Sequence, residues 1–126
     1  MSVMKYLILI YSNPQSRQTW ESFGREERIK GLEYYAALTD ELRDSGELIV
    51  TQALADPSTA QRVTARDGQT TTSDGPFAEV KEHLAGFFLV DCDSQERAVE
   101  VAARIPEASY GLVEVRPIRE LGDFEL

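Results

Sequence analysis

The sequence predicts an α+β protein in which one sheet carries two helices on the same face. Two stretches with apolar residues at three- and four-residue spacing predict the helices. Runs of β-branched and aromatic residues, each ended by Pro, Gly, Asn or Asp, predict the strands. With 126 residues the chain has the usual length of a single domain, so we expect one domain over residues 1–126.

The first strand and the longer helix lie in the first half of the chain. Val3 to Tyr11 reads as a buried strand, and polar Ser12-Asn13-Pro14 ends it. A polar connection over residues 15–25 leads to an amphipathic helix from Glu26 to about Ser45. Gly46 supplies the stop signal for that helix.

Three further strands follow the long helix. Glu47 to Ala55 and Ala60 to Ala65 are separated by a polar loop. Asp67-Gly68 then predicts a hairpin turn into Gln69 to Ser73, whose threonines suit an exposed or edge strand.

The strand from Leu84 to Asp91 has apolar residues on both faces. We place Leu84, Phe88 and Val90 on one face and the alternate residues on the other. This pattern is typical of a central strand that is buried on both sides.

The last part of the chain predicts a short helix and a final strand. Asp93 with Glu96 resembles a capping box, and the apolar stripe behind it continues until Pro106 ends the helix. Leu112 to Ile118 is the last strand, where Glu114 and Arg116 share one face.

This order of elements is ferredoxin-like in outline, with both helices on one face of the sheet. The other face then stays uncovered although it carries apolar residues. Pairing of two sheets would bury that surface, so we expect a homodimer.

Composition excludes several classes of function. Acidic residues outnumber basic ones 22 to 13, and no stretch gathers Lys and Arg into a patch, which argues against nucleic-acid binding. The first apolar run is too short to cross a bilayer or to act as a signal sequence. The single cysteine, Cys92, cannot form an internal disulfide. We therefore expect a cytoplasmic protein without a membrane partner.

The segment Thr72-Ser73-Asp74-Gly75-Pro76-Phe77-Ala78-Glu79-Val80-Lys81-Glu82-His83 carries the candidate functional residues. Turn chemistry explains Asp74 to Pro76, and Phe77 is expected to anchor the loop in the core. Turn chemistry does not require Glu79, Lys81 and Glu82 just before a buried strand. The segment is either a charged surface turn, whose charges pair with one another or with Arg116, or one wall of a site.

In the functional interpretation Asp74 and Glu82 are the catalytic candidates. Two carboxylates that face a cleft can act as general acid and base where burial raises one pKa. A structural role for Asp74 in the turn stays equally open.

Four further residues are candidates for substrate binding. Lys81 or Arg116 would hold an anionic or enol oxygen of the substrate. Tyr11 and Tyr35 would add phenol donors, against the alternative that their rings belong to the core.

Other chemistries are disfavoured by the sequence. His83, the only histidine, is expected at the surface because its neighbours alternate between faces. A metal site lacks paired histidines or cysteines, and Cys92 lies beside two aspartates that would raise its pKa. No phosphate loop or dinucleotide motif is present, so no cofactor is expected.

The pattern Asp74-Gly75-Pro76-Phe77-Ala78-Glu79, followed by Lys81-Glu82 and Gly86-Phe87-Phe88, resembles the DGPF family of YCII-related proteins. The likeness covers nearly the whole chain. It implies a dimeric α/β barrel built from ferredoxin-like subunits.

The resemblance implies less about chemistry. Some YCII-like relatives have a histidine and an aspartate in a cleft, with the histidine on the first helix. In this sequence the predicted first helix contains Tyr34 and Tyr35 but no histidine. The mechanism of those relatives therefore cannot be carried over to this chain. Some DGPF genes are similar to accessory genes beside sigma-factor genes, which implies an interaction role.

Two functions follow from these observations. The first is a homodimer with a cleft beside the Asp74–Phe77 turn that binds a small polar or anionic organic molecule. Cofactor-free acid/base chemistry of the lyase, isomerase or hydrolase type fits that cleft, and whether the protein is an enzyme stays open. The second is a non-catalytic interaction module that meets a transcription factor.

Overall fold

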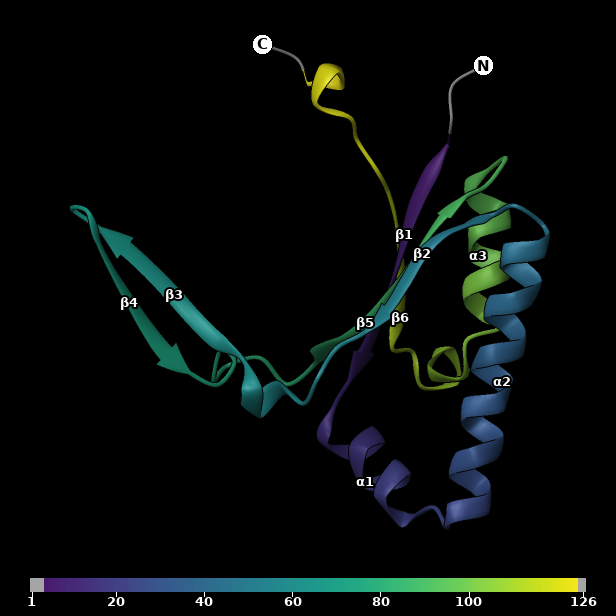
Figure 1. The fold of residues 1–126 in the computed structure, drawn as a ribbon, viewed down its shortest axis with the longest axis horizontal. Helices are drawn as coiled ribbons and strands as arrows, with labels where there is room; N and C mark the ends of the chain where they lie inside the picture. The colour runs from purple at the N-terminus through teal and green to yellow at the C-terminus, as the bar shows by residue number, and fades with distance from the viewer. Residues whose placement is uncertain (1–3, 125–126) are drawn as a thin grey trace.

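The computed structural model describes residues 4–124, which form a four-stranded sheet, three α-helices and a separate hairpin (Figure 1). The sheet contains β1 (Lys5–Ser12), β2 (Leu48–Ala53), β5 (His83–Asp91) and β6 (Val113–Pro117). Their order is β2-β5-β1-β6, and all neighbouring pairs are antiparallel. The predicted α+β class is therefore confirmed.

The helices α2 (Arg25–Asp44) and α3 (Gln95–Ala103) lie side by side on one face of the sheet (Figure 1). Alternate residues of β1 and β5 point toward these helices and are buried, whereas their neighbours are only partly buried. The expected placement of two helices on one face is thus confirmed. The core consists of Tyr6, Ile8, Ile10, Leu38, Leu42, Phe88, Val90, Cys92, Ala98, Val101, Ala102 and Ile105.

No helix of the described residues 4–124 covers the opposite face of the sheet. The residues of β1 and β5 that point this way are half-buried, with Leu7 opposite Leu89 and Leu9 opposite Phe87. On β6 the charged side chains of Glu114 and Arg116 continue the same face, since they stand opposite Leu9 and Leu7. β5 is therefore buried on one side only within a single chain.

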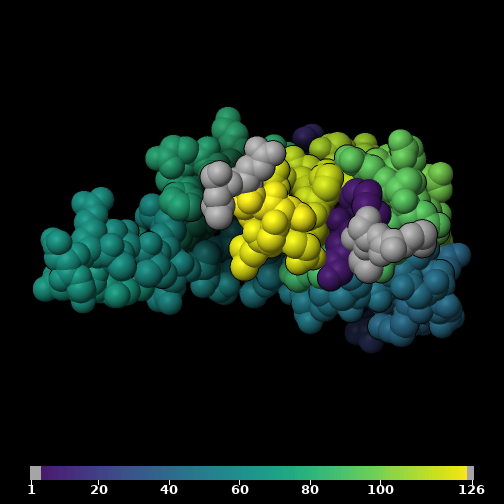
Figure 2. Space-filling view, turned by 90° about the horizontal axis from the view of Figure 1, so that it is seen from above, coloured from purple at the N-terminus to yellow at the C-terminus, as the bar shows by residue number. Residues whose placement is uncertain are grey.

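The strands β3 (Gln61–Arg66) and β4 (Gln69–Asp74) pair with each other and form a hairpin that projects from the body. Asp67 and Gly68 at its tip have φ angles of 51° and 76°, the positive values of a type I′ turn, which confirms the predicted hairpin turn. Every residue of both strands is exposed. Figure 2 shows the hairpin as a narrow lobe at one end of the molecule.

One helix was not predicted, and the predicted cap of another is wrong. Residues 15–25 are not only a connection, because α1 (Pro14–Ser22) occupies most of them. Asn13 caps this helix by accepting a hydrogen bond from the Ser16 backbone at 2.7 Å. At α3 the cap is Ser94, whose Oγ accepts from the Arg97 backbone at 3.1 Å, rather than Asp93.

The predicted face of Leu84 is also wrong. The register between β1 and β5 shifts after Ile10, so that Gly86 stands opposite Ile10 and Leu84 opposite Tyr11. This irregularity adds one residue to β5 and reverses the alternation beyond it. Leu84 is consequently exposed, whereas Phe88 is buried in the core.

Short 3₁₀ helices complete the chain at Pro57–Thr59 (η1), Pro106–Tyr110 (η2) and Leu121–Asp123 (η3). Within residues 4–124, no helix is long and apolar enough to cross a membrane.

Candidate functional site

The turn that follows β4 joins the hairpin to the central strand β5. Gly75 has a φ of 85°, a left-handed value that favours glycine, and its N–H donates to the Ala60 carbonyl at 2.7 Å. Phe77 is 60% exposed and does not anchor the loop in the core, contrary to expectation. Its ring instead lies 5.5 Å from the Arg62 guanidinium of the hairpin.

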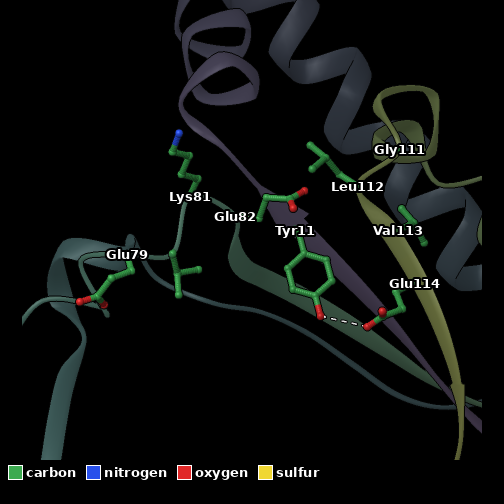
Figure 3. A pocket seen from close by; sticks show the side chains of 9 residues that line it. Tyr11, Glu79, Lys81, Glu82, Gly111, Leu112, Val113 and Glu114 are labelled. Atoms are coloured by element: carbon green, nitrogen blue, oxygen red, sulfur yellow. Dashed lines mark hydrogen bonds between the residues drawn. The ribbon is translucent and has the colours of Figure 1, made fainter.

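The residues after this turn form one wall of a cavity of about 630 Å³. The opposite wall comes from the start of β6 and the segment before it, and Tyr11 at the end of β1 lies between the two walls (Figure 3). We call this cavity the turn cleft. Its lining residues are Tyr11, Glu79, Val80, Lys81, Glu82, Gly111, Leu112, Val113 and Glu114.

Tyr11 and Glu114 are joined across the sheet within the turn cleft. The phenol of Tyr11 donates a hydrogen bond to Glu114 Oε1 at 3.2 Å, which Figure 3 marks with a dashed line. Glu114 stands opposite Leu9, two residues before Tyr11, so the bond spans a diagonal pair on one face. The pairing of β1 with β6 therefore positions both side chains.

The electrostatic surroundings hold the Tyr11 phenol in its protonated form. Partial burial raises the pKa of Tyr11, and the hydrogen bond to Glu114 and the charge of Glu114 raise it further. Arg116 lowers this pKa by less than those causes raise it, and the charge of Glu82 raises it least. Tyr11 consequently acts as a hydrogen-bond donor in the turn cleft rather than as a base.

The cleft is predominantly acidic. Glu79, Glu82 and Glu114 stand against a single cation, Lys81, among its lining residues. Within residues 4–124 no ion pair joins Glu79, Lys81 or Glu82 to another side chain. The expectation that these charges pair with one another or with Arg116 is not met.

Three of the six predicted site residues meet in this cleft. Tyr11, Lys81 and Glu82 all line it. Arg116 does not line it, although it lies near enough to Tyr11 to lower its pKa.

The other two predicted residues lie elsewhere. Asp74 is exposed at the end of β4 and is not among the residues that line the cleft. Tyr35 lies on α2, lines a different cavity and donates a hydrogen bond to Glu107. Burial, followed by that bond, raises the pKa of Tyr35 well above its usual value. The sequence could not show this separation because it arises from long-range packing.

His83 is not the surface residue that the sequence predicts. It stands opposite Ser12 in the sheet, and both of its ring nitrogens are buried without a hydrogen-bond partner among residues 4–124. It lies near Asp56, whose pKa is lowered first by hydrogen bonds from Ser58 and then by the charge of Arg17. No local pattern connects these residues, because they come from β5, α1 and the loop after β2.

The described residues offer little to a metal ion. Over 4–124, no three or more His, Cys, Asp or Glu side chains are grouped so that they could hold one. Cys92 is buried, and its surroundings raise the pKa of the thiol to about 11. Burial is the main cause, and the Glu47 carboxylate adds to it. A thiolate nucleophile is therefore absent at neutral pH.

Comparison with known proteins agrees with the resemblance read from the motifs. A family model described as the YCII-related domain matches residues 4–122. An uncharacterised protein of Rhizobium meliloti (strain 1021) is 32% identical over 117 residues, which cover 91% of this chain and 92% of that protein.

Proposed function

The chain belongs to the YCII-related family, and on that premise we propose that it is a homodimer that binds a small polar organic molecule in the turn cleft. The observation that supports this proposal most strongly is the convergence of Tyr11, Lys81 and Glu82 on one cavity beside the Asp74–Phe77 turn. The volume of about 630 Å³ falls in the range of small-molecule sites.

The charges of the turn cleft define the chemical class of its ligand. Three carboxylates and one ammonium group disfavour a ligand with a large negative charge. Hydroxyl and amine groups on a ligand would donate hydrogen bonds to Glu82 and Glu114, while Lys81 would meet one oxygen. Neutral polyhydroxy compounds and amino alcohols are the ligands that fit.

Proton transfer without a cofactor is the chemistry that these side chains support. Glu82 is an exposed carboxylate able to accept a proton, and Tyr11 is a phenol that stays protonated and donates. Together they suit a lyase, isomerase or hydrolase step. Asp74 lies outside the cleft, so Glu82 is the acid/base residue of this proposal.

Two structural features support a second copy of the chain as the partner. The hairpin β3–β4 extends about 20 Å as six-residue strands, and a two-stranded hairpin without packing partners is only marginally stable in water. The uncovered sheet face adds a half-buried apolar surface next to it. These two surfaces would be buried if two ferredoxin-like sheets faced each other in a dimeric α/β barrel. The apolar residues of that face are Leu7, Leu9, Val50, Phe87 and Leu89.

Mass measurement by light scattering tests the dimer. A dimer of the 14.1 kDa chain has a mass of about 28 kDa, twice the chain mass. Phe87→Asp, on the uncovered face, should give a monomer. The control Val99→Asp, at an exposed position of α3, should leave the dimer intact. A wild-type protein that elutes as a monomer at micromolar concentration would contradict the proposal.

Thermal unfolding with a panel of polyols, amino alcohols, amines and carboxylates tests which compounds bind in the turn cleft. Compounds that bind the native state raise the melting temperature by mass action. The polyols and amino alcohols should stabilise the wild type and the variant Glu33→Gln, an exposed control on α2. They should not stabilise Glu82→Gln. Equal responses from all three proteins would exclude Glu82 from the site.

The exposed hairpin also favours a second function, a non-catalytic module that binds a transcription factor. Val63 is 66% exposed on β3, as expected of a residue that a partner would cover. This function requires that no small molecule stabilises the protein. A cytoplasmic location is consistent with both proposals.

A further inference from the structure

A second cavity, of about 540 Å³, lies between α1, the first half of α2 and η2. We call it the aromatic cavity. Tyr11 is the one residue that it shares with the turn cleft, and none of Glu79, Lys81, Glu82 or Glu114 lines it. The aromatic cavity is therefore separate from the turn cleft, and its lining residues differ in chemical type.

Five aromatic side chains line it: Tyr11, Trp20, Phe23, Tyr35 and Tyr110. Trp20 of α1 and Phe23, the C-cap residue of that helix, meet edge to face with ring centroids 6.1 Å apart, and Tyr35 and Tyr110 contribute from α2 and η2. Such an arrangement presents flat apolar surfaces at fixed angles, which suits a planar ring.

Trp20 is held in place from two sides. The Arg28 guanidinium lies 5.5 Å from its ring centroid, and its side chain also donates to the Trp20 carbonyl at 3.2 Å. On α2, Gly31 faces the same ring, since a Cβ at that position would lie 3.5 Å from Trp20 Cζ3, an ordinary van der Waals contact. The indole is thus positioned although it is 40% exposed. This wall of the cavity is therefore preformed.

Arg17 is the only cation among the lining residues. Its guanidinium donates to Ser12 Oγ at 3.2 Å and has no ion pair within the described residues 4–124. The remaining N–H groups are therefore able to bind a carboxylate, for which the planar guanidinium is well suited.

Three acidic residues also line the aromatic cavity, and two of them already accept hydrogen bonds. Glu107 accepts from the Tyr35 phenol, and Asp56 accepts from the Ser58 backbone at 2.9 Å. Glu21, on α1, is exposed. Arg17 is the one lining group that attracts a carboxylate, and the three acidic residues limit the ligand to a single negative charge.

We propose that the aromatic cavity binds an aromatic carboxylate, with the ring against Trp20 and Phe23 and the carboxylate on Arg17. This site is independent of the turn cleft and does not rest on the function proposed for it. The aromatic wall sets the shape of the ligand, and Arg17 sets its charge.

Trp20 is the single tryptophan of the chain, so its fluorescence reports directly on this cavity. Benzoate and 3-phenylpropionate should change the emission in a saturable manner. Cyclohexanecarboxylate has the charge without the planar ring, and benzyl alcohol has the ring without the charge. Each should bind about tenfold more weakly or worse, because one of the two contacts is lost. An equal response to all four compounds, or no saturable response to any, would overturn the proposal.

Two substitutions and a control locate the binding. Arg17→Gln should weaken benzoate binding by about tenfold or more, whereas Arg25→Gln, exposed at the start of α2, should not change it. Gly31→Leu should abolish binding, because the new side chain extends toward Trp20 into the cavity. That second variant keeps the test valid if Arg17→Gln folds poorly. Unchanged binding in Gly31→Leu would overturn the proposal.

The variant Glu82→Gln distinguishes binding in the aromatic cavity from binding in the turn cleft. Benzoate should bind this variant as it binds the wild type, because Glu82 does not line the aromatic cavity. Loss of benzoate binding in Glu82→Gln with retention in Arg17→Gln would place the aromatic ligand in the turn cleft instead.

Discussion

The Tyr11 phenol donates a hydrogen bond to Glu114 Oε1 at 3.2 Å, across the end of the sheet where the turn cleft opens. Both side chains are accessible, and neither belongs to the core. A polar pair that is displayed in a cavity serves ligand binding better than it serves stability, and this difference can be measured.

Tyr11→Phe should change the free energy of unfolding by less than about 1 kcal/mol, because an exposed hydrogen bond contributes little net stability. The same variant should lose its melting-temperature response to ligands of the turn cleft. Urea unfolding and thermal shift assays of one preparation give both values. A loss of several kcal/mol with an unchanged ligand response would make the Tyr11–Glu114 pair structural.

The ion pair of Glu47 with Arg97 should make stability depend on acid pH. Arg97 Nε and Nη2 donate to the two Glu47 oxygens at 2.8 and 2.9 Å, and this pairing lowers the pKa of Glu47 from 4.5 to about 2. A lowered folded-state pKa gives stability that is fully present above pH 4.5 and is lost as the pH falls toward 2.

Glu47→Gln should therefore cost about 1–2 kcal/mol at neutral pH, a figure reduced because Arg97 is partly exposed. The cost should shrink as the pH is lowered below about 4. Glu100→Gln, which removes an exposed partner of the same Arg97, is the control and should cost less than about 0.5 kcal/mol. Urea unfolding at several pH values checks both variants. A cost that grows on acidification would contradict the assignment.

Cys92 should not react with a thiol reagent in the native protein. It is 3% exposed, and a thiol with a pKa of about 11 supplies almost no thiolate at neutral pH. A disulfide reagent should therefore modify it only in denaturant. Rapid modification of the native chain would show that this part of the core opens.

Gly86→Ala should destabilise the protein by about 1–3 kcal/mol, the usual cost of overpacking. A Cβ at this position would lie 2.8 Å from the Gln52 carbonyl oxygen of β2, where backbone cannot move aside easily. Gly122→Ala, where a Cβ would meet nothing within 4 Å, is the matched control. Thermal unfolding compares the two, and equal melting temperatures would show that β2 shifts at no cost.

The sequence predicted the sheet and its two main helices because their apolar periodicities are strong. It missed α1 because Trp20 is the only large apolar residue between Pro14 and Ser22, so periodicity gave no signal. Asn13 followed by Pro14 was a usable cap signal that indicated a helix start.

The site was partly predictable for a related reason. Lys81 and Glu82 are adjacent in the sequence, and their position beside a turn indicated the turn cleft. The aromatic cavity joins α1, α2, the loop after β2 and η2, so only the tertiary packing brings Arg17, Trp20 and Tyr110 together. The burial of the His83 ring nitrogens depends on the register shift after Ile10, which alternation alone cannot reveal.

Mapping a stabilising ligand by amide chemical shifts on the isotope-labelled protein is the most direct test of the turn cleft. We predict saturable shifts that cluster at residues 79–82 and 111–114, the two walls of the cavity, and that vanish in Glu82→Gln. Shifts that cluster elsewhere, or no saturable shift with any compound of the panel, would contradict the proposal that this cleft is the functional site.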